Sequence, residues 1–227
     1  NAPDMNQYGL IKDSDGEIWL ARGRERLLNE KDVPIKGEHN LMNALSALAI
    51  GELAGLPLES MLTTLKNFVG LPHRCEFITT THQLDCFDDS KGTNIGSTIA
   101  AILGLGKVYA PKGKKLAVIL GGQGKGQNFA ELAKPLMEYA QVVYFIGEDA
   151  DKIVADLASA GLDSHNSAGI VLTECQTLEQ AVKQAWQDQS TFPALGVLLL
   201  SPACASFDQF SGYVERGQVF QRLVKSQ

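Results

Sequence analysis

Paired cysteines, long apolar runs and concentrated positive charge are all missing from this sequence. Its four cysteines form no Cys-x-x-Cys pair and no metal-ligand spacing, which favours a reduced protein of the cytoplasm. No apolar run reaches the ~18 residues that a membrane-spanning helix needs. The net charge is −6, and the only dense basic run, at residues 112–115, is too short for a nucleic-acid surface. These absences favour a small-molecule ligand.

Histidine motifs for metal binding are absent as well. The four histidines show no H-E-x-x-H or similar spacing, so each is expected to be structural rather than a ligand. No residue of this chain is therefore assigned to a metal site.

The first 70 residues combine a hairpin signal with two helical segments. Ile11 and Ile18 flank the polar turn KDSDGE, which predicts a β-hairpin. Within residues 38–69 the apolar positions recur at helical spacing, and Gly55 separates two predicted helices. Because a hairpin is marginal without a core of its own, we expect the chain to be the back part of a longer protein.

From residue 75 onward, continuous apolar segments alternate with amphipathic ones. This alternation predicts an α/β fold with a mostly parallel sheet covered by helices on both faces. We expect six strands between residues 75 and 200, with an initial hairpin at one end of the sheet and four parallel strands after it. A linker at residues 70–74 is expected to separate this part from the first.

Three polar loops follow predicted strands, and in an open α/β sheet ligands bind beyond the carboxyl ends of the strands. In loop 1 (residues 88–94, DDSKGTN), Thr93 or Asn94 could cap the next helix, whose N-terminus favours an anion. Lys91 adds a positive charge, and Asp88 and Asp89 could hold a ribose hydroxyl or a magnesium ion. A capped helix with solvated charges explains the same residues, and composition leaves both readings open.

Loop 2 and loop 3 carry less specific signals. Loop 2 (residues 121–128, GGQGKGQN) fails both the Walker A pattern and G-x-G-x-x-G, so it is either a glycine turn or a support for Lys125 to pair with an anion. Loop 3 (residues 201–210, SPACASFDQF) offers Ser206 and backbone N–H groups. Its Cys204 is expected to be a buried structural thiol. Together the loops suit a small dianionic ligand beside a nucleotide.

Five motifs in order, GEHNLMNALSALA, GLPHRCEFI, DDSKGTNIGST, VILGGQGKG and LLLSPACASFDQF, strongly resemble the Mur ligase family. The resemblance covers essentially the whole chain, and DDSKGTN with SPACASFDQF points to the members that add D-glutamate. It implies that residues 1–73 are the end of a central ATP-binding domain and that residues 74–227 are a complete Rossmann-like C-terminal domain. We then expect the N-terminal UDP-binding domain and the Walker A loop to be missing, and the chain to be inactive alone.

The family reaction uses ATP and Mg²⁺ to join D-glutamate to UDP-N-acetylmuramoyl-L-alanine through an acyl phosphate. By match to the family motifs, the nucleotide contacts fall on Asn40, Asn43, His73, Arg74 and Asp89. The D-glutamate contacts fall on Lys91, Thr93, Lys125, Ser206, Phe207 and Tyr213, with Lys91 as the catalytic residue. Two alternatives remain open: a Mur ligase that adds another amino acid, and a non-catalytic α/β module that binds a small anion.

Overall fold

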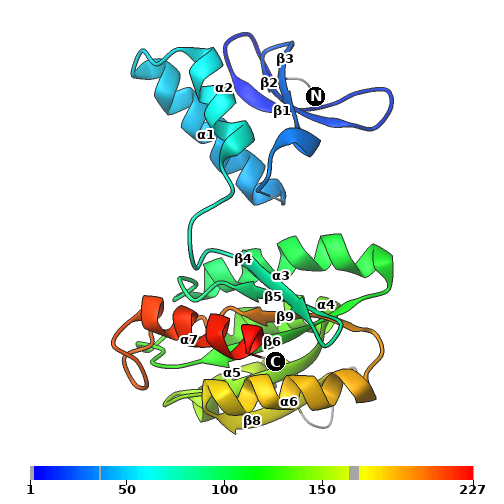
Figure 1. Cartoon of the computed structure of the whole chain (residues 1–227), viewed down its shortest axis with the longest axis vertical. Helices are drawn as coiled ribbons and strands as arrows, with labels where there is room; N and C mark the ends of the chain where they lie inside the picture. The colour runs from blue at the N-terminus through cyan, green and yellow to red at the C-terminus, as the bar shows by residue number, and fades with distance from the viewer. Residues whose placement is uncertain (1–2, 36, 164–168, 227) are drawn as a thin grey trace. The chain divides into compact units, whose positions relative to one another are not determined.

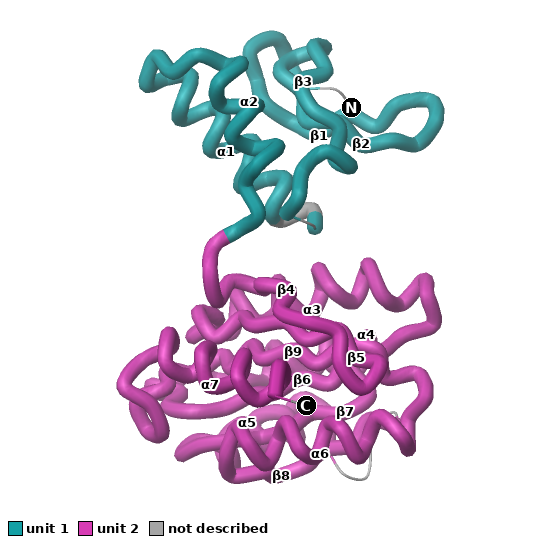
Figure 2. The backbone as a smooth tube through the Cα atoms, viewed as in Figure 1, with its two compact units in different colours: residues 1–70 teal, residues 71–227 magenta. Residues whose placement is uncertain are grey.

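The computed structural model describes residues 3–35, 37–163 and 169–226, which belong to two compact units (Figures 1 and 2). Unit 1 spans residues 1–70 and unit 2 spans residues 71–227. The units divide three residues before the expected boundary at residue 73. The assignment of unit 1 to a central ATP-binding domain stays a prediction.

Unit 1 packs two helices against a small antiparallel sheet. The sheet has the order β1 (Tyr8–Lys12), β2 (Ile18–Arg22) and β3 (Glu25–Asn29), and a short 3-10 turn, η1 (Glu30–Asp32), precedes α1 (Glu38–Leu53) and α2 (Leu58–Asn67). The predicted hairpin is confirmed, since Ile11 pairs with Trp19. The predicted apolar face of α1 is buried against the sheet residues Leu20 and Leu28.

Unit 2 is an α/β domain built on a six-stranded sheet, as the sequence predicts (Figure 1). The strand order is β4-β5-β9-β6-β7-β8. The strands are β4 (Glu76–Thr81), β5 (Leu84–Asp88), β6 (Lys115–Gly121), β7 (Ala140–Ile146), β8 (Val171–Gln176) and β9 (Leu195–Leu200). The helices are α3 (Ile95–Tyr109), α4 (Ala133–Tyr139), α5 (Ala150–Ser159), α6 (Leu178–Thr191) and α7 (Tyr213–Lys225), with 3-10 turns η2 (Ala110–Lys112) and η3 (Phe129–Leu132).

The parallel part of the sheet is larger than expected. β4 pairs antiparallel with β5, but β5 itself pairs parallel with β9 and thereby joins the parallel set. β9 in turn pairs parallel with β6, and β6, β7 and β8 continue in parallel. The four later strands are parallel and the hairpin lies at one end of the sheet, as predicted, and β5 adds a fifth parallel strand because its second partner, β9, is distant in sequence.

Helices cover both faces of the sheet, and each face has its own core. Along β6, Val118 and Leu120 pack with α3, α4 and α5, whereas Ala117 and Ile119 face α6 and α7. This alternation follows from the two-residue period of a strand. In the described part of the chain no helix is long and apolar enough to cross a bilayer.

The strand order also decides where the loops meet. β9 lies between β5 and β6, so the carboxyl ends of these three strands are neighbours. Loops 1, 2 and 3 leave β5, β6 and β9 respectively. The topology therefore gathers the three polar loops at one edge of the sheet, where such folds bind ligands.

Candidate functional site

Loop 1 is a short connection between β5 and α3 that is held by hydrogen bonds. Asn94 caps α3, because its Oδ1 accepts a hydrogen bond from Ser97 N at 2.9 Å. Of the two predicted caps, the structure thus uses Asn94. Thr93 is half-buried, and its backbone N–H donates to Lys91 O at 2.8 Å.

Asp89 is a buried carboxylate that links loop 1 to its surroundings. Cys75 N donates to its Oδ1 at 3.1 Å, and Ser201 Oγ donates to its Oδ2 at 2.6 Å. Burial raises the pKa of Asp89 to about 6 and outweighs the hydrogen bonds, which lower it. Asp89 therefore ties the segment before β4 and the start of loop 3 to loop 1.

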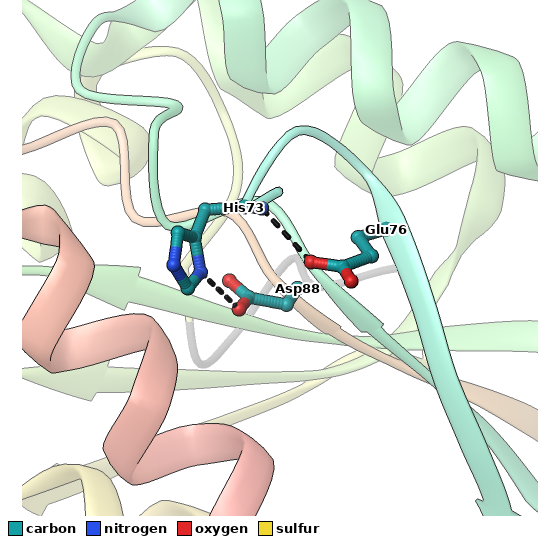
Figure 3. A group of neighbouring side chains, drawn as sticks. All are labelled: His73, Glu76 and Asp88. Carbon is teal, nitrogen blue, oxygen red and sulfur yellow. Dashed lines mark hydrogen bonds and ion pairs between the residues drawn. The ribbon is translucent and has the colours of Figure 1, made fainter. Parts of the chain in front are cut away.

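Asp88 lies in a second network, shown in Figure 3. His73 Nδ1 donates to Asp88 Oδ2 at 2.7 Å, and His73 N donates to Glu76 Oε2 at 3.0 Å (Figure 3). Gln221 Nε2 donates to Asp88 Oδ2 at 2.9 Å and approaches Glu76 Oε2 at 3.4 Å. Gly217 leaves room for this network, since a Cβ there would collide with the His73 ring.

His73, Glu76 and Asp88 offer metal-ligand atoms within 4.8 Å of one another. The oxygens of Asp88 are already engaged by donors, because Ser90 N also donates to its Oδ1 at 2.9 Å. Mg²⁺ prefers several oxygen ligands and retained waters in octahedral geometry. A network of N–H donors does not provide that set, so the residues around Asp88 and Asp89 do not fit a magnesium site in this arrangement.

His73, in the predicted linker, is held by unit 2. The residue is only 6% exposed, and its backbone oxygen accepts a hydrogen bond from Lys91 N at 3.0 Å. His73 is thereby fixed to loop 1, whereas Arg74 has an exposed side chain. Because His73 and Lys91 both belong to unit 2, these contacts do not cross the linker, and its role as a hinge stays a prediction.

Lys91 and Tyr213 lie together. Lys91 Nζ is 4.2 Å from the centroid of the Tyr213 ring, which is cation–π distance. The His73 ring meets the same ring edge-on, with centroids 6.1 Å apart. Ser90 Oγ donates to Tyr213 O at 2.8 Å and so fixes the start of α7 to loop 1. The structure thus brings His73, Lys91 and Tyr213 into one cluster.

Loops 2 and 3 are joined by their backbones. Gln123 N donates to Ala205 O at 2.8 Å, and Ala205 N donates to Gln123 O at 2.9 Å. Gly122, with φ +123°, allows this approach, because a Cβ there would collide with Ala205 O. Lys125 is exposed, and its Nζ is 5.9 Å from the centroid of the Phe207 ring. Lys125 and Phe207 are therefore neighbours.

The remaining predicted residues of loop 3 have contrasting environments. Ser206 is 2% exposed, whereas Phe207 is 64% exposed. Cys204 is fully buried, and burial raises the pKa of its thiol to about 12. A thiol in that state is a poor nucleophile, which agrees with the structural role expected for it.

Two residues that the sequence analysis missed bridge the loops. Arg216, in α7, donates from Nε to Ser90 Oγ at 3.0 Å and from Nη2 to Ser90 O and Cys204 O at 2.9 and 3.0 Å. Gln127 Nε2 donates to Gly124 O at 3.0 Å and Ala203 O at 3.2 Å. The sequence does contain one indication that Arg216 is buried. It lies four residues before Phe220, on the apolar face of an amphipathic helix.

Asn40 and Asn43 belong to α1 and are described within unit 1 only. The Asn43 side chain is exposed, and Asn40 is half-buried near the start of the helix. Their spacing of three residues puts them on the same side of α1. The other predicted site residues all belong to unit 2.

Comparisons with known proteins agree with this geometry. A model of the Mur ligase glutamate ligase domain matches residues 73–204. UDP-N-acetylmuramoylalanine–D-glutamate ligase of Psychrobacter arcticus is 55% identical over 226 residues, which cover 99% of this chain and 47% of that protein. The enzyme of the same name from Acinetobacter baylyi is 49% identical over 224 residues, again 99% and 47% of the two chains. The chain thus spans about half the length of these relatives.

Solved structures share the fold at low sequence identity. UDP-N-acetylmuramate-alanine ligase of Thermotoga maritima has a TM-score of 0.61 and 18% identity, covering 93% of this chain and 43% of that one. Folylpolyglutamate synthase of Mycobacterium tuberculosis, complexed with ADP, has a TM-score of 0.60 and 15% identity, covering 95% and 47%. These likenesses concern the fold alone. The family model matches more than half of the chain, which shows that this chain belongs to the Mur ligase family.

Proposed function

We propose that the chain is the C-terminal half of an ATP-dependent ligase that adds D-glutamate to UDP-N-acetylmuramoyl-L-alanine in peptidoglycan precursor synthesis. The observation that carries the proposal is the junction of loops 1, 2 and 3 in a chain 55% identical to a relative of that name. A cytoplasmic location belongs to the same proposal. The longer protein is called the complete ligase below.

The three loops offer the donors that a dianionic amino acid needs. Lys125 extends from loop 2 as an exposed cation, and Lys91 supplies a second cation from loop 1. We assign Lys125, Thr93 and Ser206 to the two carboxylates, with the backbone at Phe207 as a further donor. Tyr213 would close the pocket beside Lys91. Charge-assisted hydrogen bonds of this kind are shorter and stronger than neutral ones.

The nucleotide side of the proposal uses Asn40, Asn43, His73, Arg74 and Asp89. A carboxylate has about four lone-pair sites, so Asp89 can still accept from a ribose hydroxyl while it binds Cys75 N and Ser201 Oγ. His73 uses Nδ1 for Asp88 and keeps Nε2 for another partner. Lys91 would lie between the nucleotide phosphate and the D-glutamate carboxylate, which is the reason to assign it the catalytic role.

ATP would supply the phosphoryl group that activates the alanyl carboxylate. The described residues do not form a cradle for it, since loop 2 lacks the Walker A spacing and its Ser or Thr. Asp88 and Asp89 do not fit Mg²⁺ either, because both are buried, whereas Mg²⁺ keeps several waters of its octahedral shell. We therefore assign ATP and Mg²⁺ to the complete ligase. The part played by this chain is to bind D-glutamate and hold its amine toward the activated carboxylate.

The test is phosphate release by the complete ligase with ATP, Mg²⁺ and UDP-N-acetylmuramoyl-L-alanine. D-Glutamate should support release, and L-lysine and diaminopimelate should not. The 227-residue chain alone should release no phosphate, although it should melt cooperatively. Phosphate release supported equally by L-lysine would contradict the assignment of D-glutamate as the substrate. Phosphate release by the chain alone, at a rate comparable to that of the complete ligase, would contradict the assignment of ATP and Mg²⁺ to the complete ligase.

A further inference from the structure

Arg216 is a buried cation at the junction of the three loops. Its side chain is among the largest fully buried ones, and the residue is 1% exposed. Its three hydrogen bonds all go to neutral acceptors, namely Ser90 Oγ, Ser90 O and Cys204 O. A guanidinium offers five N–H donors in a fixed planar fork, so it can hold two chain segments at one spacing.

This guanidinium has no carboxylate partner among the described residues of the chain, as no ion pair within 4.0 Å involves it. Nη1 is buried and has no hydrogen-bond partner. It points toward loop 2, since a Cβ on Gly122 would lie 3.2 Å from it. A buried charge without a contact ion pair is costly, and only the more distant carboxylates of Asp88, Asp89 and Asp208 favour it here.

The contacts of Arg216 lie beside the residues proposed to bind D-glutamate. Ser90 directly precedes Lys91, Cys204 lies two residues before Ser206, and Gly122 lies three residues before Lys125. The fork thus holds loop 1 to loop 3 and faces loop 2. Any shift of Ser90 or Cys204 would move the ligand-binding side chains next to them.

We infer that Arg216 is a positioning residue of the proposed D-glutamate pocket and that its buried charge, which lacks a contact ion pair, favours a dianionic ligand. The inference rests on the proposed function. The ligand brings negative charge to the loops that surround the guanidinium, and this charge offsets part of the cost of burying it. The fork sets the spacing of loops 1 and 3, and the charge adds selectivity for the doubly charged ligand.

The experiment measures binding of D-glutamate and D-glutamine to the 227-residue chain and three variants by calorimetric titration. Arg216→Gln removes the charge and should weaken D-glutamate binding at least about ten-fold, with a smaller effect on D-glutamine, which has one carboxylate fewer. Arg216→Lys keeps the charge but not the fork, so it should retain part of the preference for D-glutamate. Val224→Ala, a core change in α7 on the face toward α6, should lower the melting temperature and leave both affinities unchanged.

A measurement on the wild-type chain covers the case in which a variant does not fold. The side-chain N–H resonances of Arg216 in NMR spectra should shift, and their exchange with water should slow, as D-glutamate is added. Equal affinities in wild type and Arg216→Gln, or Arg216 resonances unchanged at saturation, would overturn the inference alone. A wild-type chain that binds D-glutamine as well as D-glutamate would instead contradict the proposed function.

Discussion

Removal of the Lys125 ammonium should weaken D-glutamate binding in the complete ligase. The side chain is exposed at the tip of loop 2, and the structure gives it a ring contact with Phe207 but no carboxylate partner among the described residues. In Lys125→Ala one charge-assisted hydrogen bond to the ligand is lost, worth roughly 1.5–3 kcal/mol. The KM for D-glutamate should therefore rise between about ten-fold and somewhat over one hundred-fold.

Arginine at this position should not restore the KM fully. Its planar fork approaches a carboxylate differently from an ammonium on a flexible stem. The Lys125 backbone has φ +52°, a left-handed conformation that fixes the direction in which the side chain leaves the loop. Lys125→Arg should therefore give a KM between those of the wild type and the alanine variant.

Lys112 offers a matched control. It is also exposed and lies over an aromatic ring, 4.9 Å from the Tyr109 centroid, but it precedes β6 at the opposite edge of the sheet. Lys112→Ala should leave the KM for D-glutamate unchanged. The assay is phosphate release at varied D-glutamate with the other substrates saturating. An unchanged KM in Lys125→Ala, or an equal rise in Lys112→Ala, would refute the assignment of Lys125.

Three further changes test the surrounding structure. Burial raises the pKa of Asp89 to about 6 from an ordinary 3.8, so its stabilisation is present below about pH 4 and is lost as the pH rises through 6. The unfolding free energy of wild type relative to Asp89→Asn should therefore fall by about 3 kcal/mol between about pH 3 and about pH 7, measured by urea titration at each pH. Tyr213→Leu should raise the KM for D-glutamate roughly two- to thirty-fold by loss of the ring contact with Lys91, whereas Tyr213→Phe should not. Gly122 and Gly113 both have positive φ, but only a Cβ at residue 122 would meet the backbone of loop 3. Gly122→Ala should therefore lower the unfolding free energy, measured in urea, by more than the about 1 kcal/mol expected for Gly113→Ala.

Each of these predictions has an outcome that contradicts it. A constant difference between wild type and Asp89→Asn across the pH range would show that Asp89 titrates normally. Equal KM values for the Tyr213→Leu and Tyr213→Phe variants would show that the Tyr213 ring does not contribute to D-glutamate binding. Equal losses of stability in the two glycine variants would mean that loop 2 does not depend on its close approach to loop 3.

The sequence predicted best the elements whose own periodicity defines them. β6 and β9 are unbroken apolar runs, and the buried face of α1 recurs at helical spacing, so local pattern sufficed for all three. β3 was missed because it begins with charged residues, and only its last residues are buried. Residues 129–140 are divided into the 3-10 turn η3, then α4, with β7 starting at Ala140, and the alternating pattern does not mark these divisions.

The unpredicted parts of the site depend on contacts between distant residues. Ser90 and Arg216 are 126 positions apart, and no local pattern links them. Loop 1 was recognised from its own composition, but its anchoring to His73 requires the chain before β4 to fold back onto it. The sequence thus indicated which loops carry the chemistry, whereas the residues that hold those loops together emerged only from the tertiary structure.

If unit 2 contains a pocket for D-glutamate, an NMR titration of the purified chain with each enantiomer of glutamate will detect it. D-Glutamate should shift the resonances of Thr93, Lys125 and Ser206 in a saturable way, weakly but at lower concentrations than L-glutamate does. Fixed donors on three loops should discriminate between the enantiomers, since two carboxylates and an amine cannot superpose in both. Equal shifts with both enantiomers, or shifts confined to other parts of unit 2, would contradict the account.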